Sequence, residues 1–405
     1  MSIKLSNKIQ NFLILLPFVL IYLGAIFLKV HHFTGSMLKM AAFFYMILYV
    51  LIYQKTPLNL LLTTSLFLLF LVYAVWHSFN FTAGYQAAIR YMFPVVTIFY
   101  GYSIRKHFPL ILKFIIVFIL INFLAQFSNY YHWYHHELQW FYHFTKSGHA
   151  YFNTAMGIMR ASGIVVYFAF FAFMNMIAFF LIKTYYQGKY KKILMAIALL
   201  MMFASLSFKT IGSFIIVLMF YYHEKILNLI TLGFLGILAF FIAFPMKSKE
   251  FLDNMIYRLN AYILMKKPTV RGETYHLMVQ EFGKLNLFGR GAGAFGGPAS
   301  LQFHSPYYKE VNFTWPDTFW MNLTTVDTFP PHVFIELGIV GGLLFFIVLT
   351  TPLFRRKVSA IVLIIYFTLF FDMLFTFSLA SLEYMMFSLV LIYPILYYEK
   401  QLKEN

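Results

Sequence analysis

Several basic side chains in this chain have the type and setting to hold phosphate groups. Arginine presents a planar fork of N–H donors that grips phosphate oxygens in pairs, and lysine supplies a compact point charge. Two or three such cations converging on a pyrophosphate would stabilise it electrostatically as a leaving group. For each of them the alternative interpretation is a loop salt bridge or a side chain that extends to the membrane surface. The candidates are Arg90, Arg160, Lys209, Arg258, Arg271 and Arg290.

A general base is the second group that such chemistry needs, and His332 is the first candidate. It opens an apolar run, HVFIELGIVGGLLFFIV, that has the length of a membrane helix. Glu336 lies one turn further along the same face, where it could orient the imidazole or pair with an arginine. Glu273 and Asp317 are the rival candidates for the base. The alternative for His332 is an interfacial polar residue that caps the helix.

Most of these residues lie in or beside one polar segment, 246–331, of an otherwise apolar chain. The composition is 61% hydrophobic and only 11% charged, against about 25% charged in soluble domains. Apolar runs near the length of roughly 20 residues that crosses a bilayer recur along the sequence. We therefore expect a single all-α integral membrane domain over 1–405. Its expected transmembrane helices, about twelve in number, are 11–28, 37–53, 58–76, 86–104, 109–127, 161–182, 191–207, 210–223, 226–245, 332–353, 357–378 and 381–398.

The positive charges indicate how these helices are oriented. The net charge of +17 is spread in short clusters of lysine and arginine between apolar runs, which is typical of topology signals rather than of nucleic-acid binding. With both termini in the cytoplasm, the inner loops hold most of these residues. The large loop 246–331, between the ninth and tenth helices, then lies on the outer side of the membrane, which is the periplasmic side in a bacterial inner membrane. The second external loop, 128–160, faces the same side.

An external site excludes chemistry driven by cytoplasmic nucleotides, and the motifs agree with this. The chain has no Gly-Lys-Ser/Thr of a phosphate-binding loop. The run Gly291-Ala-Gly293-Ala-Phe-Gly296 matches a dinucleotide fingerprint only formally, because it follows no apolar strand. We interpret it as a flexible turn that closes a helix over 272–284, with an anion-binding nest beside Arg290 as a lesser alternative. The energy for chemistry must then come from a donor already at the outer face, and a lipid-linked donor is the natural kind.

No metal site and no cofactor are expected. Asp-x-Asp pairs, the usual ligands of metal-bound diphosphates, are missing from the sequence. Histidines do cluster in the loop 128–160, but aromatic residues surround them and Glu137 is the one carboxylate nearby. That pattern is typical of an interfacial aromatic belt, with metal binding or sugar stacking as alternatives. The histidines are His132, His135, His136, His143 and His149.

The order of these elements resembles a known family. Arg160-Ala-Ser-Gly163 opens one span, Ser205-Leu-Ser-Phe-Lys209 breaks another, and Arg271-Gly-Glu-Thr-Tyr lies in the large loop. Asn286-Leu-Phe-Gly-Arg-Gly-Ala-Gly293 and His332-Val-Phe-Ile-Glu-Leu-Gly-Ile-Val-Gly341 follow. Over residues 155–350 this is similar to the O-antigen polymerase and O-antigen ligase superfamily, multi-spanning bacterial inner-membrane glycosyltransferases of the C-type architecture.

The resemblance implies roles for individual residues. Arg160 and Arg271 correspond to family arginines, the latter associated with the lipid pyrophosphate. His332 corresponds to the histidine proposed to activate the acceptor hydroxyl. Lys209 departs from the family's usual Ser-Arg and loses the guanidinium fork, and Val333 stands where asparagine is common.

The expected function is therefore that of an O-antigen polymerase in lipopolysaccharide biosynthesis. The expected donor and acceptor are oligosaccharides linked to undecaprenyl pyrophosphate, joined at the outer face of the inner membrane without metal. A chain-length regulator is a further candidate partner, and nucleic acid is not expected. The alternatives are a ligase that transfers the glycan to lipid A–core and a non-enzymatic flippase, although the internal repeats typical of transporters are not visible.

Overall fold

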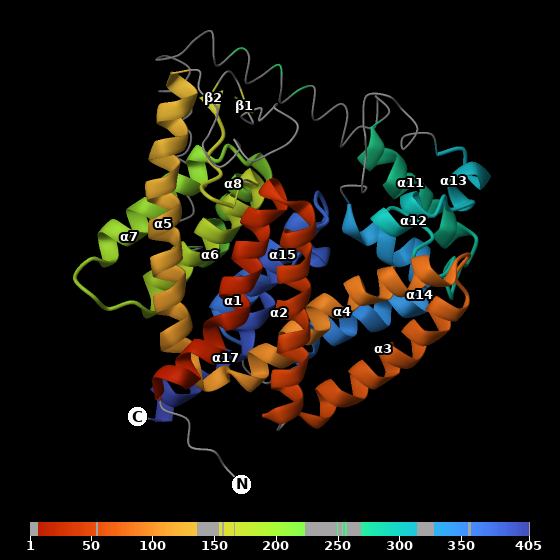
Figure 1. Ribbon diagram of the computed structural model, residues 1–405, viewed down its shortest axis with the longest axis horizontal. Coiled ribbons are helices and arrows are strands. Elements are labelled where there is room, and N and C mark those ends of the chain that lie inside the picture. Colours follow the sequence, from red (N-terminus) through yellow and green to blue (C-terminus); the bar gives the residue numbers. More distant parts are fainter. Residues whose placement is uncertain are drawn as a thin grey trace.

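Figure 1 shows the computed structural model of the chain, in which the described residues are mostly helical. The one pair of strands in the described residues is β1 (Thr154–Ala155) with β2 (Ile158–Met159), two residues each and antiparallel. The structure describes residues 7–53, 56–135, 154–155, 158–165, 167–222, 249, 253, 256, 269–313, 328–354 and 358–404.

The long helices follow the apolar runs of the sequence. They are α1 (Asn7–Val30), α2 (His32–Ile52), α3 (Leu58–Trp76), α4 (Phe81–Ser103), α5 (Phe108–Tyr134), α6 (Phe168–Tyr185) and α14 (Phe329–Thr350). Shorter ones are α7 (Lys191–Ala204), α8 (Phe208–Tyr221), α15 (Ala360–Met373), α16 (Leu382–Met386) and α17 (Leu389–Glu404). Single 3-10 turns are η1 (Arg105–His107), η6 (Thr351–Leu353) and η7 (Ser378–Ala380).

Among the described residues, six helical stretches are long and apolar enough to cross a membrane. They are 7–28, 32–52, 58–76, 105–134, 168–185 and 329–353. These helices indicate a multi-pass, all-α membrane protein, as expected from the composition. The finer expectation of about twelve spans is not confirmed.

Polar residues lie at several places where the observed helices differ from the expected spans. The run 357–378 ends as a helix at Met373, next to Asp372, and 381–398 is divided between α16 and α17. The run 191–207 yields only the 14 residues of α7, and the helix expected from 161 starts at Phe168. The expected span 226–245 lies outside the described residues.

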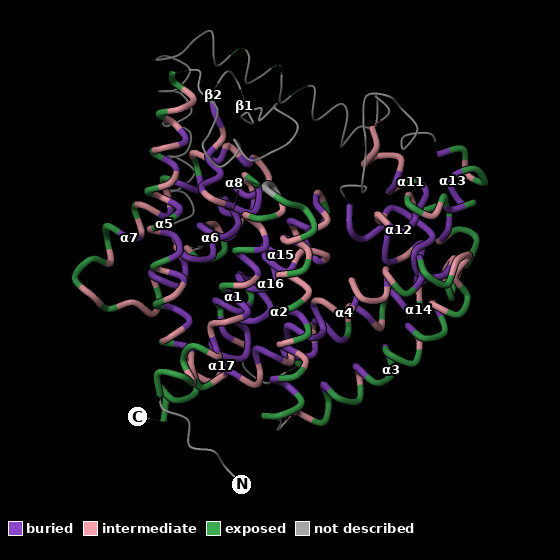
Figure 2. Tube along the Cα trace, in the orientation of Figure 1, coloured by how far each residue is buried: buried purple, intermediate pink, exposed green. Residues whose placement is uncertain are grey.

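Helix α3 has one face packed against the protein and an opposite apolar face that is exposed, as expected of a helix in contact with lipid. Its buried side is Leu60, Thr64, Phe67, Leu71 and Ala74, spaced as one face of a helix. The opposite side carries large exposed apolar residues, and Figure 2 shows α3 as mostly exposed while α6 is almost wholly buried. An apolar stripe of this length is unfavourable in water, and hydrocarbon covers it without cost. The stripe consists of Leu58, Leu62, Leu66, Leu69, Val72 and Trp76.

Part of the polar segment folds as a cap on the first half of α14. The cap, defined here as 269–313, holds α11 (Val270–Gly283), α12 (Pro298–Gln302) and α13 (Tyr307–Glu310). Its own small core joins Leu277, Phe295, Tyr307, Tyr308 and Phe313 to Ile335 of α14. In Figure 1 the cap lies far from the start of α1 and from the end of α17.

Candidate functional site

Helix α14 is broken at Gly338, and the glycine-rich turn of the cap joins it there. Gly338 has φ 67° and ψ −171°, a conformation that only glycine adopts readily. The break frees the carbonyls of the preceding helical turn from their usual partners. The backbone N–H of Arg290 donates to Ile335 O at 2.9 Å, and that of Gly291 donates to Glu336 O at 3.0 Å.

The same turn also pairs with the backbone beyond the break. Ile339 N donates to Asn286 O at 3.2 Å, and Val340 N donates to Leu287 O at 3.0 Å. A Cβ on Gly289 would lie 2.2 Å from the α14 backbone, so only glycine allows this approach. The expectation of a flexible turn needs correction, because the turn is held to α14 by backbone hydrogen bonds on both sides of the break. The same bonds occupy the N–H groups that an anion-binding nest beside Arg290 would need.

Glu336 adds a side-chain bond to this joint. Its Oε2 accepts a hydrogen bond from the hydroxyl of Tyr91 in α4 at 2.7 Å, and its Oε1 accepts one from Phe295 N at 3.1 Å. The side chain is buried. A buried carboxylate is tolerated only with such partners. Glu336 therefore ties α4, α14 and the cap together, and these hydrogen bonds are not directed at His332.

His332 lies beside this joint, in the first turn of α14. Its ring is buried, 4.4 Å between centroids from Phe377, and a Cβ on Gly296 would come within 2.5 Å of it. A small cavity of about 20 Å³ separates it from Arg90 and Glu336. That volume suits a single water molecule. Within the described part of the chain, Arg90 makes no ion pair or hydrogen bond, and its cation faces this cavity together with the Glu336 carboxylate.

Lys209 lies in a buried ion pair that sequence reasoning missed. Its Nζ is 2.9 Å from Oδ1 of Asp372 in α15 and donates to Thr376 Oγ1 at 3.1 Å. Asp372 Oδ2 accepts a hydrogen bond from the Thr376 hydroxyl at 3.0 Å. The lone carboxylate in the apolar run AIVLIIYFTLFFDM was the available signal, because an acid in such a run needs a partner.

Arg160 contacts the turn that precedes Lys209. Its Nε donates to Ser205 O at 3.1 Å and its Nη2 to Leu206 O at 2.7 Å. The guanidinium also lies over the ring of Phe168, 3.2 Å from the centroid. Arg160 thus holds the end of α7 and lies near the first turn of α8.

Arg271 and Glu273 lie in the first turn of α11, which reaches the same region. The Tyr275 hydroxyl donates to Leu374 O, directly after α15, at 2.8 Å. The hydroxyls of Thr274 and Thr328 are 2.9 Å apart, which joins this turn to the start of α14. Asp317, the third candidate base, lies outside the described residues, as does Arg258.

Arg290 has a structural role instead of an open phosphate-binding position. Its Nε and Nη2 bind the two carboxylate oxygens of Glu281, each at 3.0 Å, and its Nη1 lies 3.0 Å from Glu310 Oε1. Burial alone would raise the pKa of Glu281, but hydrogen bonds from Arg290, Asn286 and Lys284 outweigh it and lower the pKa to about 2. These bonds occupy the guanidinium of Arg290 within the cap.

The ion pair makes the cap sensitive to acid. Glu281 has an ordinary pKa of 4.5 and a folded pKa of about 2, so its contribution is present above pH 4.5 and is lost as the pH falls toward 2. We expect the cap to lose about 2 kcal/mol of stability over that interval. Amide hydrogen exchange of residues 269–313 measures this. In Glu281→Gln the loss over the same interval should vanish, and an unchanged pH response there would contradict the assignment.

Comparison of the whole chain with protein-family models and with curated proteins finds no match in either.

Proposed function

We propose that this protein is a surface-polysaccharide polymerase, a glycosyltransferase that joins repeat units carried on undecaprenyl pyrophosphate. The observation that carries the proposal is that three separate segments meet at the stretch 372–377, and that a fourth, which holds Arg160, binds the turn before Lys209. Lys209 binds Asp372 and Thr376, and the α11 turn that holds Arg271 bonds to Leu374 through Tyr275. The His332 ring lies tilted against that of Phe377, and Arg160 binds the turn beside Lys209.

In the proposed reaction the cations of this cluster hold the donor's pyrophosphate. Arg160, Lys209 and Arg271 come from three different segments, and Arg90 faces the cavity beside His332. As the bond between the anomeric carbon and the pyrophosphate oxygen breaks, its electron pair stays on the pyrophosphate. Positive charges fixed in a partly buried site stabilise that developing charge more than water would.

His332 is the proposed base for the acceptor. The sugar hydroxyl of the acceptor gives its proton to the imidazole, and its oxygen forms the new bond to the anomeric carbon. The cavity beside the ring admits one water, and a hydroxyl of the same size could take that place. Glu273, beside Arg271, and Asp317 remain the rival bases. Neither metal nor nucleotide enters this scheme.

Reconstitution tests the function directly. Purified protein in liposomes, given undecaprenyl-pyrophosphate-linked repeat units alone, should produce a ladder of glycans that differ by one repeat unit. Gel separation of the released glycans measures it, and Arg271→Ala protein, at equal amount, should leave single units unextended. Translocation of the units without elongation would contradict the enzyme and favour a flippase. Transfer only after lipid A–core is added would favour a ligase.

A further inference from the structure

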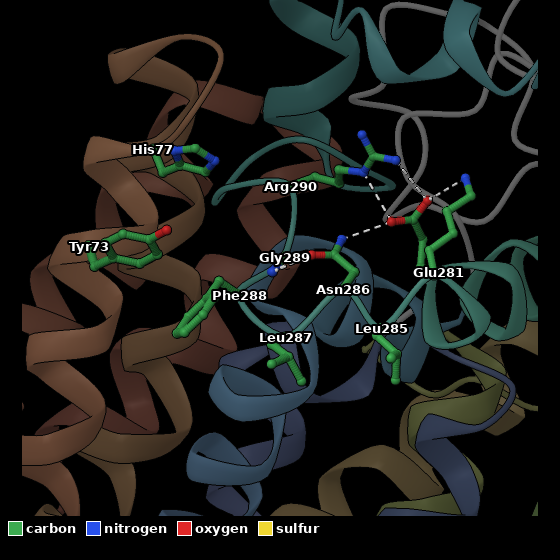
Figure 3. Close-up of a pocket in the computed structure, with 10 residues that line it drawn as sticks. Tyr73, His77, Glu281, Leu285, Asn286, Leu287, Phe288, Gly289 and Arg290 are labelled. Atoms are coloured by element: carbon green, nitrogen blue, oxygen red, sulfur yellow. Dashed lines mark hydrogen bonds and ion pairs between the residues drawn. The ribbon is translucent and has the colours of Figure 1, made fainter.

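A hollow of the cap lies on the other side of the glycine turn from His332. It has a volume of about 660 Å³, which is in the range of small-molecule sites. The end of α3 forms one wall and the end of α11 the opposite wall, with the turn as the floor between them (Figure 3). The same turn thus lines the hollow through Gly289 and Arg290 and the His332 cavity through Gly293 and Gly297.

One wall of the hollow is aromatic. The rings of Tyr73 and His77 are nearly parallel, 9° between planes and 5.7 Å between centroids. Phe288 stands edge-on to Tyr73 at 5.9 Å and is 52% exposed. Exposed aromatic faces in a polar hollow offer the C–H groups of a sugar ring a flat, weakly polar partner. Among the described residues, neither the Tyr73 hydroxyl nor the His77 ring has a hydrogen-bond partner, so both can bind a ligand.

The opposite wall is polar and preorganised. Asn286 Nδ2 and Lys284 Nζ both donate to Glu281, which Arg290 holds in place. The Lys284 side chain is 54% exposed, so its ammonium can still donate to a ligand. The charge of Arg290 is already balanced by Glu281 and Glu310. A wall of fixed donors and acceptors with little excess charge suits neutral hydroxyl groups better than it suits phosphate.

We propose that this hollow binds a pyranose residue of the glycan, stacked on Phe288 beside Tyr73, with its hydroxyls on Lys284 and His77. The choice of a sugar as the occupant rests on the proposed function. Because the turn separates the hollow from the His332 cavity, a glycan held here would have its far residues fixed while one end reaches the site of transfer. The hollow would then contribute to acceptor affinity and not to the chemical step.

Saturation-transfer NMR on the purified full chain tests the site with soluble probes. The probes are maltose, cellobiose, chitobiose and digalacturonate, with inorganic phosphate as a separate arm. We expect at least one disaccharide to bind, and Phe288→Ala and His77→Ala to weaken that binding by about fivefold, the typical effect of one aromatic contact. Phe81→Ala is the matched control, an aromatic residue that is 69% exposed and lies outside the hollow.

Three results would overturn the site. They are no disaccharide signal, equal weakening in Phe81→Ala, and displacement of the sugar by inorganic phosphate. Because the probes carry no lipid and no pyrophosphate, binding does not require catalysis. Sugar binding without elongation would therefore contradict the proposed polymerase function but support this sugar site. If both Phe288→Ala and His77→Ala elongate glycans with an unchanged acceptor KM, the sugar site is contradicted and the polymerase function is not.

Discussion

The double variant Lys209→Met with Asp372→Leu should fold as well as the unaltered protein and elongate glycans about 10²-fold to 10³-fold more slowly. The Asp372 side chain is buried, at 3% exposed, the Lys209 side chain is mostly buried, at 14% exposed, and the two form an ion pair. Removing one partner leaves a buried charge unpaired, which costs about 3–5 kcal/mol, whereas replacing both by apolar residues is often neutral. Thr376 keeps its bond to the backbone oxygen of Asp372.

Comparing single and double variants separates the two roles of Lys209. Each single variant should lower the melting temperature in detergent, and the double variant should restore it. Rates are measured in the reconstituted elongation assay. If Lys209 serves only to satisfy Asp372, the double variant will elongate at the normal rate, and the phosphate role is then excluded. Lys400→Met is the matched control, because its pair with Glu404 is exposed and contributes little.

Replacing Gly338 by alanine should destabilise the protein by about 3 kcal/mol or more and detach the cap. A Cβ there would lie 2.3 Å from Gly289 N and 2.5 Å from Leu287 O, and both are backbone atoms that cannot move aside cheaply. The positive φ adds strain of about 1–3 kcal/mol. Thermal unfolding and protease cleavage within 269–313 measure the two effects.

Gly212→Ala is the control for glycine replacement as such. Gly212 lies inside α8, and an added Cβ there meets nothing within 4 Å. Alanine in a helix interior is favoured over glycine by roughly 1 kcal/mol, so this variant should be slightly more stable than the unaltered protein. Equal loss of stability in both variants would show that the break in α14 is not what makes Gly338 necessary.

Hydropathy was a good guide to the helices and a poor guide to where they end. Runs such as 58–76 became helices with the expected bounds, because most of their residues are apolar and none is charged. Near Asp372 and through 378–388, side-chain hydrogen bonds to the backbone compete with the helix, and window averages of hydropathy do not register them.

The candidate site was harder to predict because its parts meet only in three dimensions. The sequence identifies Arg160, Lys209 and His332 as candidates by residue type. It does not reveal that Lys209 pairs with Asp372, which lies 163 positions away. Arg290 was a phosphate-binding candidate for the same reason, but it pairs with Glu281 because the turn between them brings the two together. Charge type suggests what a residue can bind, whereas only packing decides whether another group already occupies it.

The joint between the glycine turn and α14 has a consequence for how this scaffold can diversify. Its four hydrogen bonds use only main-chain atoms of residues 286, 287, 290 and 291. The side chains of Leu287 and Phe288 are therefore not needed to keep the joint closed, and they lie exposed at the hollow. Substitutions at these two positions can therefore change what the hollow binds without disturbing the joint. The same fold could in this way acquire different ligand specificities by point substitution.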